Sequence, residues 1–270
     1  KIEQFHMDIA SSIQKVTETI ILKITESLYN EYKIENLCLA GGVALNCVAN
    51  GKILKQNKFK NIWIQPASGD AGGSLGAAYA AWYNELNKPF IKRNFPQDEM
   101  QGSYLGPQFK EEEIEKVLNS KGAIFKKHTY NEIIEKTAND LSNGKAIGWF
   151  QGKMEFGPRS LGSRSILADA RSKIIQKDLN LKVKFRESFR PFAPSILKED
   201  CSQWFDIDCE SPYMLLVGLI NNKYKLKLSN DEKKLFGIDK LNTIRSKLPA
   251  ITHVDYSARI QTVDKNTNPL

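Results

Sequence analysis

Two successive units, each with an apolar run, a glycine turn and a helix, constrain the fold of this 270-residue chain most strongly. The first unit is an apolar run with paired glycines, "NLCLAGG", followed by a helical pattern, "VALNCVANGKILKQN". The second repeats this order in "NIWIQPASGD" and "AGGSLGAAYAAWYNEL". Alternating strands and helices, with ligand-facing turns where the strands end, are typical of an α/β fold. The sequence therefore predicts strands at 37–40 and 61–65 in one sheet.

The flanking segments extend this α/β prediction. Residues 8–32 have an apolar spacing of three and four, which predicts an amphipathic helix packed on that sheet through Ile9, Ile13, Val16, Ile20, Ile24 and Leu28. Residues 87–110 contain three prolines and no period, which favours a linker wrapped on the surface. Beyond it, we expect helices in "EEEIEKVLNSKG" and "NEIIEKTANDLSNG", each ended by glycine, and a lysine-rich exposed insertion at 221–237. We expect strands, several of them antiparallel, in "AIFKKH", "AIGWFQ", "YMLLVGLI", "AITHVD" and "ARIQTVD".

The composition excludes several protein classes. Hydrophobic residues make up 41% of the chain and charged residues 26%, as in soluble globular proteins. No stretch approaches ~18 uninterrupted apolar residues, so we expect no membrane contact. The four cysteines form no CxxC pair, which favours reduced thiols in a cytoplasmic protein, with a Cys201–Cys209 bridge as the alternative. The chain starts inside a helical pattern without methionine, and we expect a fragment of a longer protein.

Both glycine turns are candidate ligand sites. Gly41 and Gly42 let backbone N–H groups approach a ligand, although close packing of strand and helix would use them equally well. Asn46 follows, either to contact a ribose or to cap the next helix. In the second turn, Asp70 stands at the head of a glycine and alanine helix. It is either an N-terminal helix cap or a ligand for a metal.

Basic residues concentrate in the second half of the chain. The net charge is +8, and the stretch from Gln151 to Arg190 holds ten Lys or Arg against four Asp or Glu. Much of this charge lies among Gly, Pro and Ser, in "GKMEFGPRSLGSRSILADAR" and "KFRESFRPFAPS". Guanidinium groups match phosphate bidentately, so the pattern favours a phosphate pocket over a solvated basic face. Phe185, Phe189 and Phe192 alternate with the charges and are expected to pack inward.

We expect different roles for the individual basic residues of this segment. We expect Arg159, Lys184 and Arg190 to converge on one pocket, and one or both of Arg164 and Arg186 to serve folding through internal carboxylate pairs. Only His6, His128 and His253 occur, none paired at i and i+4, which argues against a complete metal site within the chain.

Five blocks together resemble the O-carbamoyltransferases of the nodulation, cephamycin and tobramycin type. They are "LAGGVALNCVANGKI", "PASGDAGGSLGAAYAA", "GKMEFGPRSLGSRSILADAR", "VKFRESFRPFAPSIL" and "HVDYSARIQTV", in the family's order and within residues 1 to 263. The resemblance implies the C-terminal part of an actin-like (Kae1-like) domain at 1–86 and a linker at 87–110. A YrdC-like α/β domain, incomplete at its C-terminus, would follow at 111–270.

The resemblance also implies a reaction and its site residues. The YrdC-like part would form carbamoyl adenylate from carbamoyl phosphate and ATP, and the actin-like part would transfer the carbamoyl group to a hydroxyl of a small molecule. Carried over, Arg159, Lys184 and Arg190 form the catalytic phosphate cluster. Nucleotide binding falls to Gly41, Gly42, Asn46, Ser68, Gly69 and Arg259. Asp70 becomes the aspartate ligand of an Fe(II) ion that two histidines also hold.

The sequence departs from this family at both ends. A first half with His-x-x-x-His on a helix and a final Asn-Thr-Ser-Phe-Asn segment are missing, so we expect no iron here and incomplete activity. Two alternatives stay open: a YrdC-like RNA-binding or tRNA-modification module, and a hydrogenase-maturation type of carbamoyltransferase. Nucleic acid is the less favoured partner, because a surface aromatic platform is lacking. The oligomeric state is open, with a homodimer among the alternatives.

Overall fold

The N-terminal part forms the predicted α/β unit. The structure, a computed structural model, describes residues 2–90 and 98–268. Its first elements are α1 (Gln4–Tyr32), β1 (Asn36–Leu39), α2 (Cys47–Lys55), β2 (Asn61–Ile64) and α3 (Asp70–Ala80), which a π-helical turn extends over Ala81–Glu85. Strands β1 and β2 pair in parallel, with Leu37 opposite Ile62. The predicted strands at 37–40 and 61–65 are therefore confirmed.

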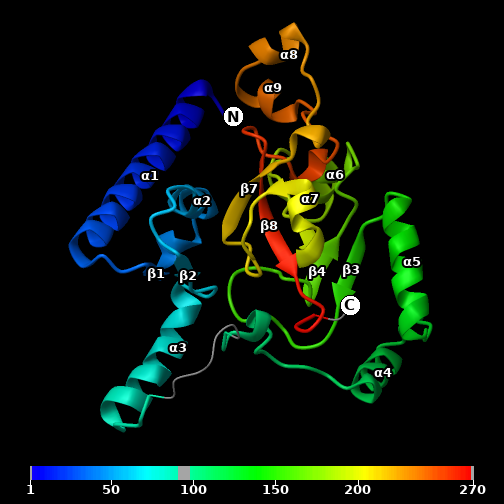
Figure 1. The fold of residues 1–270 in the computed structure, drawn as a ribbon. Helices are drawn as coiled ribbons and strands as arrows, with labels where there is room; N and C mark the ends of the chain where they lie inside the picture. The colour runs from blue at the N-terminus through cyan, green and yellow to red at the C-terminus, as the bar shows by residue number, and fades with distance from the viewer. Residues whose placement is uncertain (1, 91–97, 269–270) are drawn as a thin grey trace.

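The C-terminal part mixes helices with short, mostly antiparallel strands (Figure 1). It begins with α4 (Glu111–Ser120), α5 (Tyr130–Ser142), β3 (Ile147–Phe150), β4 (Arg164–Leu167), α6 (Ile175–Lys182) and β5 (Ser195–Leu197). It continues with α7 (Cys201–Trp204), β6 (Phe205–Asp206), β7 (Leu216–Ile220), α8 (Asn230–Lys234), α9 (Gly237–Asn242) and β8 (Ser257–Val263). Strands β3 and β4 form one antiparallel pair. The larger sheet has the order β5-β8-β7-β6, in which only β5 and β8 are parallel.

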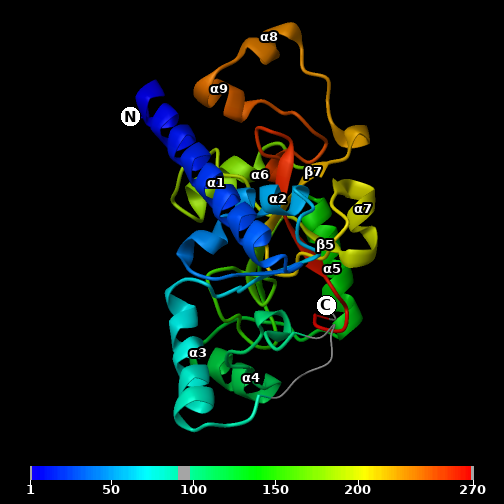
Figure 2. The same ribbon diagram turned by 60° about the vertical axis from the view of Figure 1, so that its left-hand side comes forward.

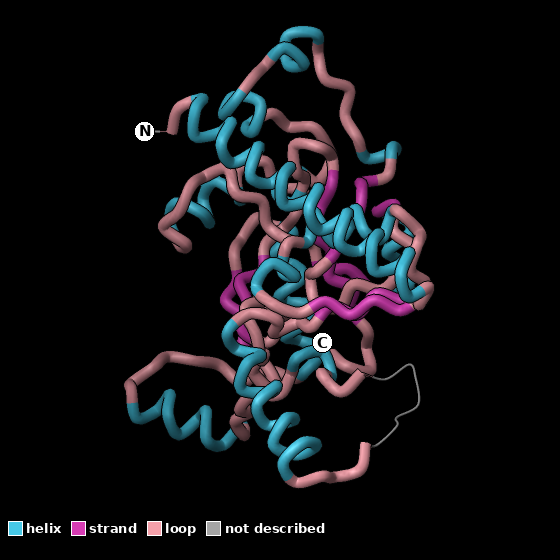
Figure 3. Tube along the Cα trace, turned by 90° about the vertical axis from the view of Figure 1, so that its left-hand side faces the viewer, coloured by secondary structure: helices cyan, strands magenta, loops and turns pink. Residues whose placement is uncertain are grey.

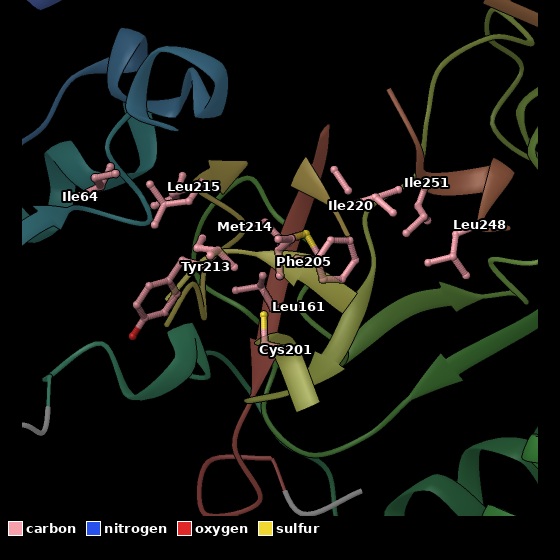
Figure 4. Packing of buried hydrophobic residues seen from close by; sticks show 14 of the residues in the cluster. Ile64, Leu161, Cys201, Phe205, Tyr213, Met214, Leu215, Ile220, Leu248 and Ile251 are labelled. Carbon is pink, nitrogen blue, oxygen red and sulfur yellow. The ribbon is translucent and has the colours of Figure 1, made fainter. Parts of the chain in front are cut away.

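One hydrophobic core joins the two parts of the chain. Ile64 of β2 belongs to the same buried cluster as Leu161, Phe205 and Leu215, as Figure 4 shows. Helix α2 lies beside β7 (Figure 1), and the buried amide of Asn50 donates to the carbonyls of Ala44 and Leu215, at 2.8 and 3.1 Å. The turns of the N-terminal unit are thus held at a fixed position against the C-terminal sheet.

The linker prediction was wrong for residues 98–106, which do not wrap on the surface. Met100 and Ser103 are buried, and Met100 belongs to the main core cluster. Both carboxylate oxygens of Asp98 accept from the Tyr213 hydroxyl, at 2.7 and 2.8 Å. Burial and this carboxylate raise the pKa of Tyr213. Residues 91–97 of the predicted linker lie outside the described residues.

Helix α1 packs through a different face from the one predicted. The expected apolar residues at 9, 13, 16, 20, 24 and 28 are 41–61% exposed. Contact is made instead by Ile21, Leu22 and Tyr29, which pack on Leu37, Ile53 and Phe59. Buried Glu18 pairs with Lys52 of α2, which fixes this orientation. Figures 2 and 3 show α1 along the outside of the molecule. The exposure of the isoleucine stripe places it on the side of α1 that faces away from the core.

Two strand predictions fail and a third holds only in part, for identifiable reasons. Residues 123–128 form a loop with Ile124 fully exposed, because the partner of β3 is β4, which lies inside the glycine-rich basic segment. Residues 250–255 turn back before β8, since the His253 N–H donates to the Ser257 carbonyl at 2.8 Å. In the run 213–220, the strand begins only at Leu216, because Met214 has a left-handed φ of 55°. Strands β4, β5 and β6 were not predicted from the sequence.

The predicted glycine ends of two helices are confirmed. Helices α4 and α5 are each followed by a glycine of left-handed φ, Gly122 and Gly144. All four cysteines are free, so Cys201 and Cys209 form no bridge. No helix in the described ranges is both long and apolar enough to span a lipid bilayer.

Gly51, inside α2, lies at the close contact between this helix and β7. A β-carbon on Gly51 would lie 2.7 Å from Val217 Cγ2 and 3.2 Å from the Val217 carbonyl oxygen. Alanine normally stabilises a helix interior relative to glycine by about 1 kcal/mol. Because overpacking costs about 1–3 kcal/mol, we expect Gly51→Ala to lower the free energy of unfolding in denaturant titrations.

The matched control is Gly76→Ala in α3, where a β-carbon would meet nothing within 4 Å. It should raise the free energy of unfolding by about 1 kcal/mol. Stabilisation by both substitutions would contradict the close contact between α2 and β7.

Candidate functional site

Two arginines from distant parts of the chain form the centre of the candidate site. Arg159 follows Gly157 in the basic segment, and Arg259 lies on β8. Each has a buried Nε atom without a hydrogen-bond partner in the part of the chain that the structure describes. Arg159 Nη2 donates to the Leu45 carbonyl at 3.0 Å. Two half-buried guanidinium groups whose N–H donors are not all used favour the binding of an anion.

The electrostatics of Arg259 indicate that these guanidinium groups are close together. Burial lowers the pKa of Arg259, and the positive charges of Arg159 and Arg186 lower it further. Cys47, the first residue of α2, lies near the same two arginines, Arg259 and Arg159. Burial raises the pKa of its thiol despite their opposing effect. No carboxylate forms an ion pair with Arg159 or Arg259 among the described residues, so the positive charge is not neutralised internally.

A close backbone approach fixes the loop that carries Arg159. Gly157 has a φ of +124°, and a β-carbon there would lie 3.3 Å from the Pro66 carbonyl and 3.4 Å from the β-carbon of Ala67. Only glycine fits this conformation and this space comfortably. The basic segment therefore lies directly against the second glycine turn of the N-terminal unit, which explains why its arginine follows a glycine.

Glu155 holds the rest of this loop, and the sequence analysis missed it. The side chain is buried, and its Oε1 atom accepts three backbone N–H groups, from Leu161 and Ser163 at 2.8 Å and from Arg164 at 3.2 Å. A carboxylate bound by several amides fixes the path of residues 155–164. The available signal was an acidic residue, one of two in the glycine-rich basic run 152–171.

Arg164 serves folding as expected, but not through a carboxylate. Its Nη1 atom donates to the carbonyls of Gln151 and Ser163, at 2.6 and 2.9 Å. Its guanidinium group stacks over Phe150, with 3.5 Å between the Cζ atom and the ring centroid. The predicted internal carboxylate pair is therefore wrong for Arg164, because backbone carbonyls and an aromatic face satisfy it instead.

Arg186 also makes internal contacts as expected of a folding role, but not with a carboxylate: its guanidinium group lies over Phe192, 5.2 Å from the ring centroid. Its Nε atom donates to Asn180 Oδ1 at 2.6 Å, so no internal carboxylate pair forms. Burial and the neighbouring Arg190 lower the pKa of Arg186. Arg190 itself pairs with Glu187 at 2.8 Å and is largely exposed. Electrostatic influence on the pKa values thus links Arg190 to Arg186, and links Arg186 and Arg159 to Arg259; we call these four residues the arginine row.

The structure does not join Lys184 to this row. Lys184 is exposed, and its ammonium group has no hydrogen-bond or ion-pair partner within the described ranges. Its neighbour Phe185 is 85% exposed with a left-handed φ of 48°, so the predicted inward packing is wrong for this phenylalanine. Phe189 and Phe192 are partly buried as expected, and Phe192 packs against the core.

The first glycine turn is open, but Asn46 is engaged. Gly41 has a φ of +94°, and a β-carbon on Gly41 or Gly42 would meet nothing within 4 Å. The Asn46 side chain accepts from the Ala49 N–H at 3.1 Å, and its amide nitrogen donates to Gln14 Oε1 at 3.0 Å. Of the two expectations for Asn46, the structure therefore shows the helix cap rather than a free ribose-binding amide.

The second turn contributes an unpartnered hydroxyl. The Oγ atom of Ser68 is buried without a hydrogen-bond partner in the described part of the chain. A β-carbon on Gly69 would lie 3.8 Å from Leu45 Cδ1, so the two glycine turns are neighbours. Ser68 follows directly after the backbone that Gly157 contacts. A buried hydroxyl beside a guanidinium site is a further donor for a bound anion.

The described residues do not fit an iron ion. Asp70 is the exposed first residue of α3, and no group of three His, Cys, Asp or Glu in the described ranges could hold a metal. His6 accepts from the Glu3 N–H, and His253 Nδ1 lies 2.9 Å from Ser257 Oγ. Asp70 is exposed as expected, and we derive no step through iron.

A histidine that the sequence analysis left unused lies beside the site. The Ser257 hydroxyl links His253 to Asp255, donating to Asp255 Oδ1 at 2.7 Å. Burial lowers the pKa of His253, and Arg259 and Arg245 lower it further against the effect of Asp255. Burial raises the pKa of Asp255, but the hydrogen bonds from Ser257 outweigh it and leave that pKa below its ordinary value. The imidazole is thus held neutral next to Arg259.

Comparisons with known proteins identify the family of the chain. Residues 1–79 match the family described as Carbamoyltransferase N-terminus, and residues 138–270 match Carbamoyltransferase C-terminus. The chain therefore belongs to the carbamoyltransferase family.

Three relatives illustrate the similarity. An uncharacterized protein of Synechocystis is 54% identical over 98% of this chain and 43% of its own length. Nodulation protein NolO of Bradyrhizobium diazoefficiens is 38% identical over 98% of this chain and 44% of its own length. The 3'-hydroxymethylcephem-O-carbamoyltransferase of Streptomyces clavuligerus is 31% identical over 86% of this chain and 37% of its own length. This chain thus spans less than half the length of these relatives.

Loss of the Glu155 charge should loosen the arginine loop. Glu155→Gln keeps the size of the side chain but weakens three charge-assisted hydrogen bonds. We expect the free energy of unfolding to fall by about 1.5–3 kcal/mol in urea titrations. The control is Glu112→Gln on the exposed side of α4, which should change stability by less than about 0.5 kcal/mol. Equal effects of the two substitutions would contradict the role of Glu155.

His253 should make the protein less stable in mild acid. Its pKa is below the ordinary value of 6.5, so the unfolded chain binds a proton that the folded protein resists. The stability that the neutral imidazole contributes is therefore complete above about pH 6.5, the ordinary pKa that applies in the unfolded chain. It is lost as the pH falls from this value through the lower pKa of His253 in the folded protein. We expect His253→Asn to flatten the pH dependence of the unfolding free energy between about pH 7 and pH 5. An unchanged slope would contradict the buried neutral imidazole.

Proposed function

We propose that this chain carries the phosphate-handling site of an O-carbamoyltransferase. The protein would form carbamoyl adenylate from carbamoyl phosphate and ATP, and then transfer the carbamoyl group to a hydroxyl of a small molecule. The observation that carries the proposal is the pair Arg159 and Arg259, whose buried Nε atoms have no partner in the described ranges. Membership of the carbamoyltransferase family supports the choice of ligand.

The residues fit a bound carbamoyl phosphate or nucleotide phosphate. Guanidinium groups bind phosphate oxygens bidentately, and a site shielded from water strengthens each contact. The Ser68 hydroxyl and the open backbone at Gly41 and Gly42 provide further donors near the same turns. No carboxylate competes for Arg159 or Arg259 among the described residues, so a dianionic ligand would satisfy charge and hydrogen bonds together.

The proposed chemistry balances as follows. Carbamoyl phosphate reacts with one water to give carbamate and phosphate. A carbamate oxygen then bonds to the α-phosphorus of ATP while the bond to pyrophosphate breaks, which gives carbamoyl adenylate. The acceptor oxygen finally bonds to the carbamoyl carbon, AMP leaves and the hydroxyl proton is released.

Negative charge develops on a phosphate leaving group in each of these three conversions. Fixed guanidinium donors stabilise such charge in the transition state. In the longer proteins of the family, we propose that the actin-like and YrdC-like domains divide these steps as the resemblance implies. Within this chain, Arg159 and Arg259 would hold the phosphate that departs.

Removal of one guanidinium group should weaken carbamoyl phosphate binding. One hydrogen bond to a charged group contributes about 1.5–3 kcal/mol, so we expect Arg159→Ala to weaken affinity roughly ten- to hundredfold in calorimetric titrations. Arg159→Lys should recover only part of this loss, because lysine lacks the planar fork. The matched control is Arg171→Ala, whose guanidinium forms a surface ion pair with Asp169 at 2.7 Å.

The same titrations separate the proposal from RNA binding. A pocket for one small anion loses affinity moderately with salt, whereas contacts with many phosphates lose it steeply. Equal, mild effects of Arg159→Ala, Lys184→Ala, Arg190→Ala and Arg171→Ala, with steep salt dependence, would contradict the pocket and favour the RNA-binding alternative.

A further inference from the structure

A turn just before β8 brings a histidine, a serine and an aspartate together. The His253 N–H donates to the Ser257 carbonyl at 2.8 Å, and the Ser257 N–H donates to Asp255 Oδ1 at 3.0 Å. Tyr256, inside the turn, has a left-handed φ of 65°. This conformation is strained for a residue with a side chain, and strain of this kind is concentrated at functional sites. The turn is therefore a place to look for a function of its side chains.

The side-chain hydrogen bonds of this turn fix the tautomer of His253. The Ser257 hydroxyl donates its only proton to Asp255 Oδ1, at 2.7 Å, so toward the imidazole it can only accept. His253 Nδ1 lies 2.9 Å from the same oxygen and therefore carries the proton that this contact needs. In the neutral imidazole, the other nitrogen, Nε2, then has a free lone pair. No hydrogen bond to Nε2 occurs among the residues that the structure describes.

Strand geometry places this histidine beside Arg259. Ser257 and Arg259 are two residues apart in β8, so their side chains project from the same face of the sheet. Arg259 is opposite Val217 in β7, the strand beside β8 in Figure 1, and Val217 lies against Gly51 of α2. The effect of Arg259 on the pKa of His253 agrees with this placement. The imidazole therefore lies on the face of the sheet that α2 covers, next to the Arg259 guanidinium group.

The imidazole also lines a cavity. This cavity has a volume of about 440 Å³ and lies between α6 and the segment that leads from α9 toward β8. Such a volume has ample room for water molecules. His253 thus lies between a space that can hold water and a guanidinium group suited to phosphate. Hydrolysis of an acyl phosphate needs this arrangement, with a base for the water and a cation for the leaving group.

We propose that His253 is the base that activates water for attack on carbamoyl phosphate, with Ser257 and Asp255 as its positioning residues. This inference rests on the proposed function, which places the phosphate group at Arg159 and Arg259. The water oxygen bonds to the carbamoyl carbon, and the bond from this carbon to the phosphate oxygen breaks with its electron pair on the phosphate. Nε2 takes one water proton and passes it to the departing phosphate. The second water proton is released when carbamic acid ionises to carbamate.

Phosphate release from carbamoyl phosphate by the whole chain tests the inference. His253→Asn keeps an N–H donor toward Ser257 but has no basic nitrogen. We expect its kcat to fall about 10²–10⁴-fold, the usual contribution of a general base. The affinity for carbamoyl phosphate in calorimetric titrations should stay within about twofold, because the guanidinium groups are intact. Ser257→Ala should lower kcat by a smaller factor. The matched control, His128→Asn beside Glu132, should change neither quantity.

Two further readouts would not respond to a purely structural role. Burial, Arg259 and Arg245 lower the pKa of His253 against the effect of Asp255. In the native chain, kcat should therefore rise with pH through a pKa below the ordinary value of 6.5 and then level off. This rise should disappear in His253→Asn. The ¹H–¹⁵N spectrum of the His253 ring should show a proton on Nδ1 in the native chain and a different tautomer population in Ser257→Ala.

The outcomes separate this inference from the proposed function. An unchanged kcat in His253→Asn, or a native imidazole with its proton on Nε2, would overturn the inference and leave the proposed function intact. Binding of carbamoyl phosphate without phosphate release above the spontaneous rate would do the same. A loss of affinity in His253→Asn as large as the loss of kcat would also overturn it. Failure of carbamoyl phosphate to bind would instead overturn the proposed function, and the inference with it.

Discussion

The arrangement depends on two guanidinium groups that the fold buries without giving them a carboxylate. Most proteins pair a buried cation with an anion of their own, because desolvation is otherwise too costly. Here Arg159 comes from a glycine loop and Arg259 from β8, and both retain a buried Nε atom without a partner in the described ranges. The rest of the chain must offset the unfavourable free energy of desolvating these two groups, and the hydrophobic core that the two parts of the chain share supplies the stability to do so.

The surrounding structure keeps these groups in place by backbone contacts. Gly157 brings its loop against Pro66 and Ala67, and Glu155 binds three amides of the same loop. Helix α2 is held on β7 by Asn50, which places the Leu45 carbonyl where Arg159 can donate to it. The turns at the ends of β1 and β2 are therefore part of the same site as the basic segment, although more than 80 residues separate Ser68 from Arg159.

The sequence predicts those features that local pattern determines. Strands β1 and β2 and helices α4 and α5 have their own periodicity and glycine ends, and they occur as expected. The failures involve partners that are distant in sequence. Strand β4 forms because β3 pairs with it. Residues 98–106 are held at the core because the Tyr213 hydroxyl donates to Asp98 and Met100 packs in the main hydrophobic cluster. The isoleucine spacing of α1 predicts a helix but not which face Glu18 and Lys52 turn inward.

The same limit applies to the site. Residue type and the glycine context identify Arg159, and the resemblance adds Arg259, but neither predicts that Arg186 connects to them while Lys184 stays exposed. His253 carries no local signal in the sequence, because its place beside Arg259 depends on burial and on segments that are folded together.

The most direct test of the central claim is ¹⁵N–¹H NMR of the arginine Nε groups during titration with carbamoyl phosphate. Arg159→Lys and Arg259→Lys variants would assign the two resonances. The account predicts that both resonances shift together and saturate at one ligand per chain, while the resonance of Arg171 stays unchanged. Shifts confined to exposed arginines such as Arg190 and Arg171, or no shift at all, would contradict it.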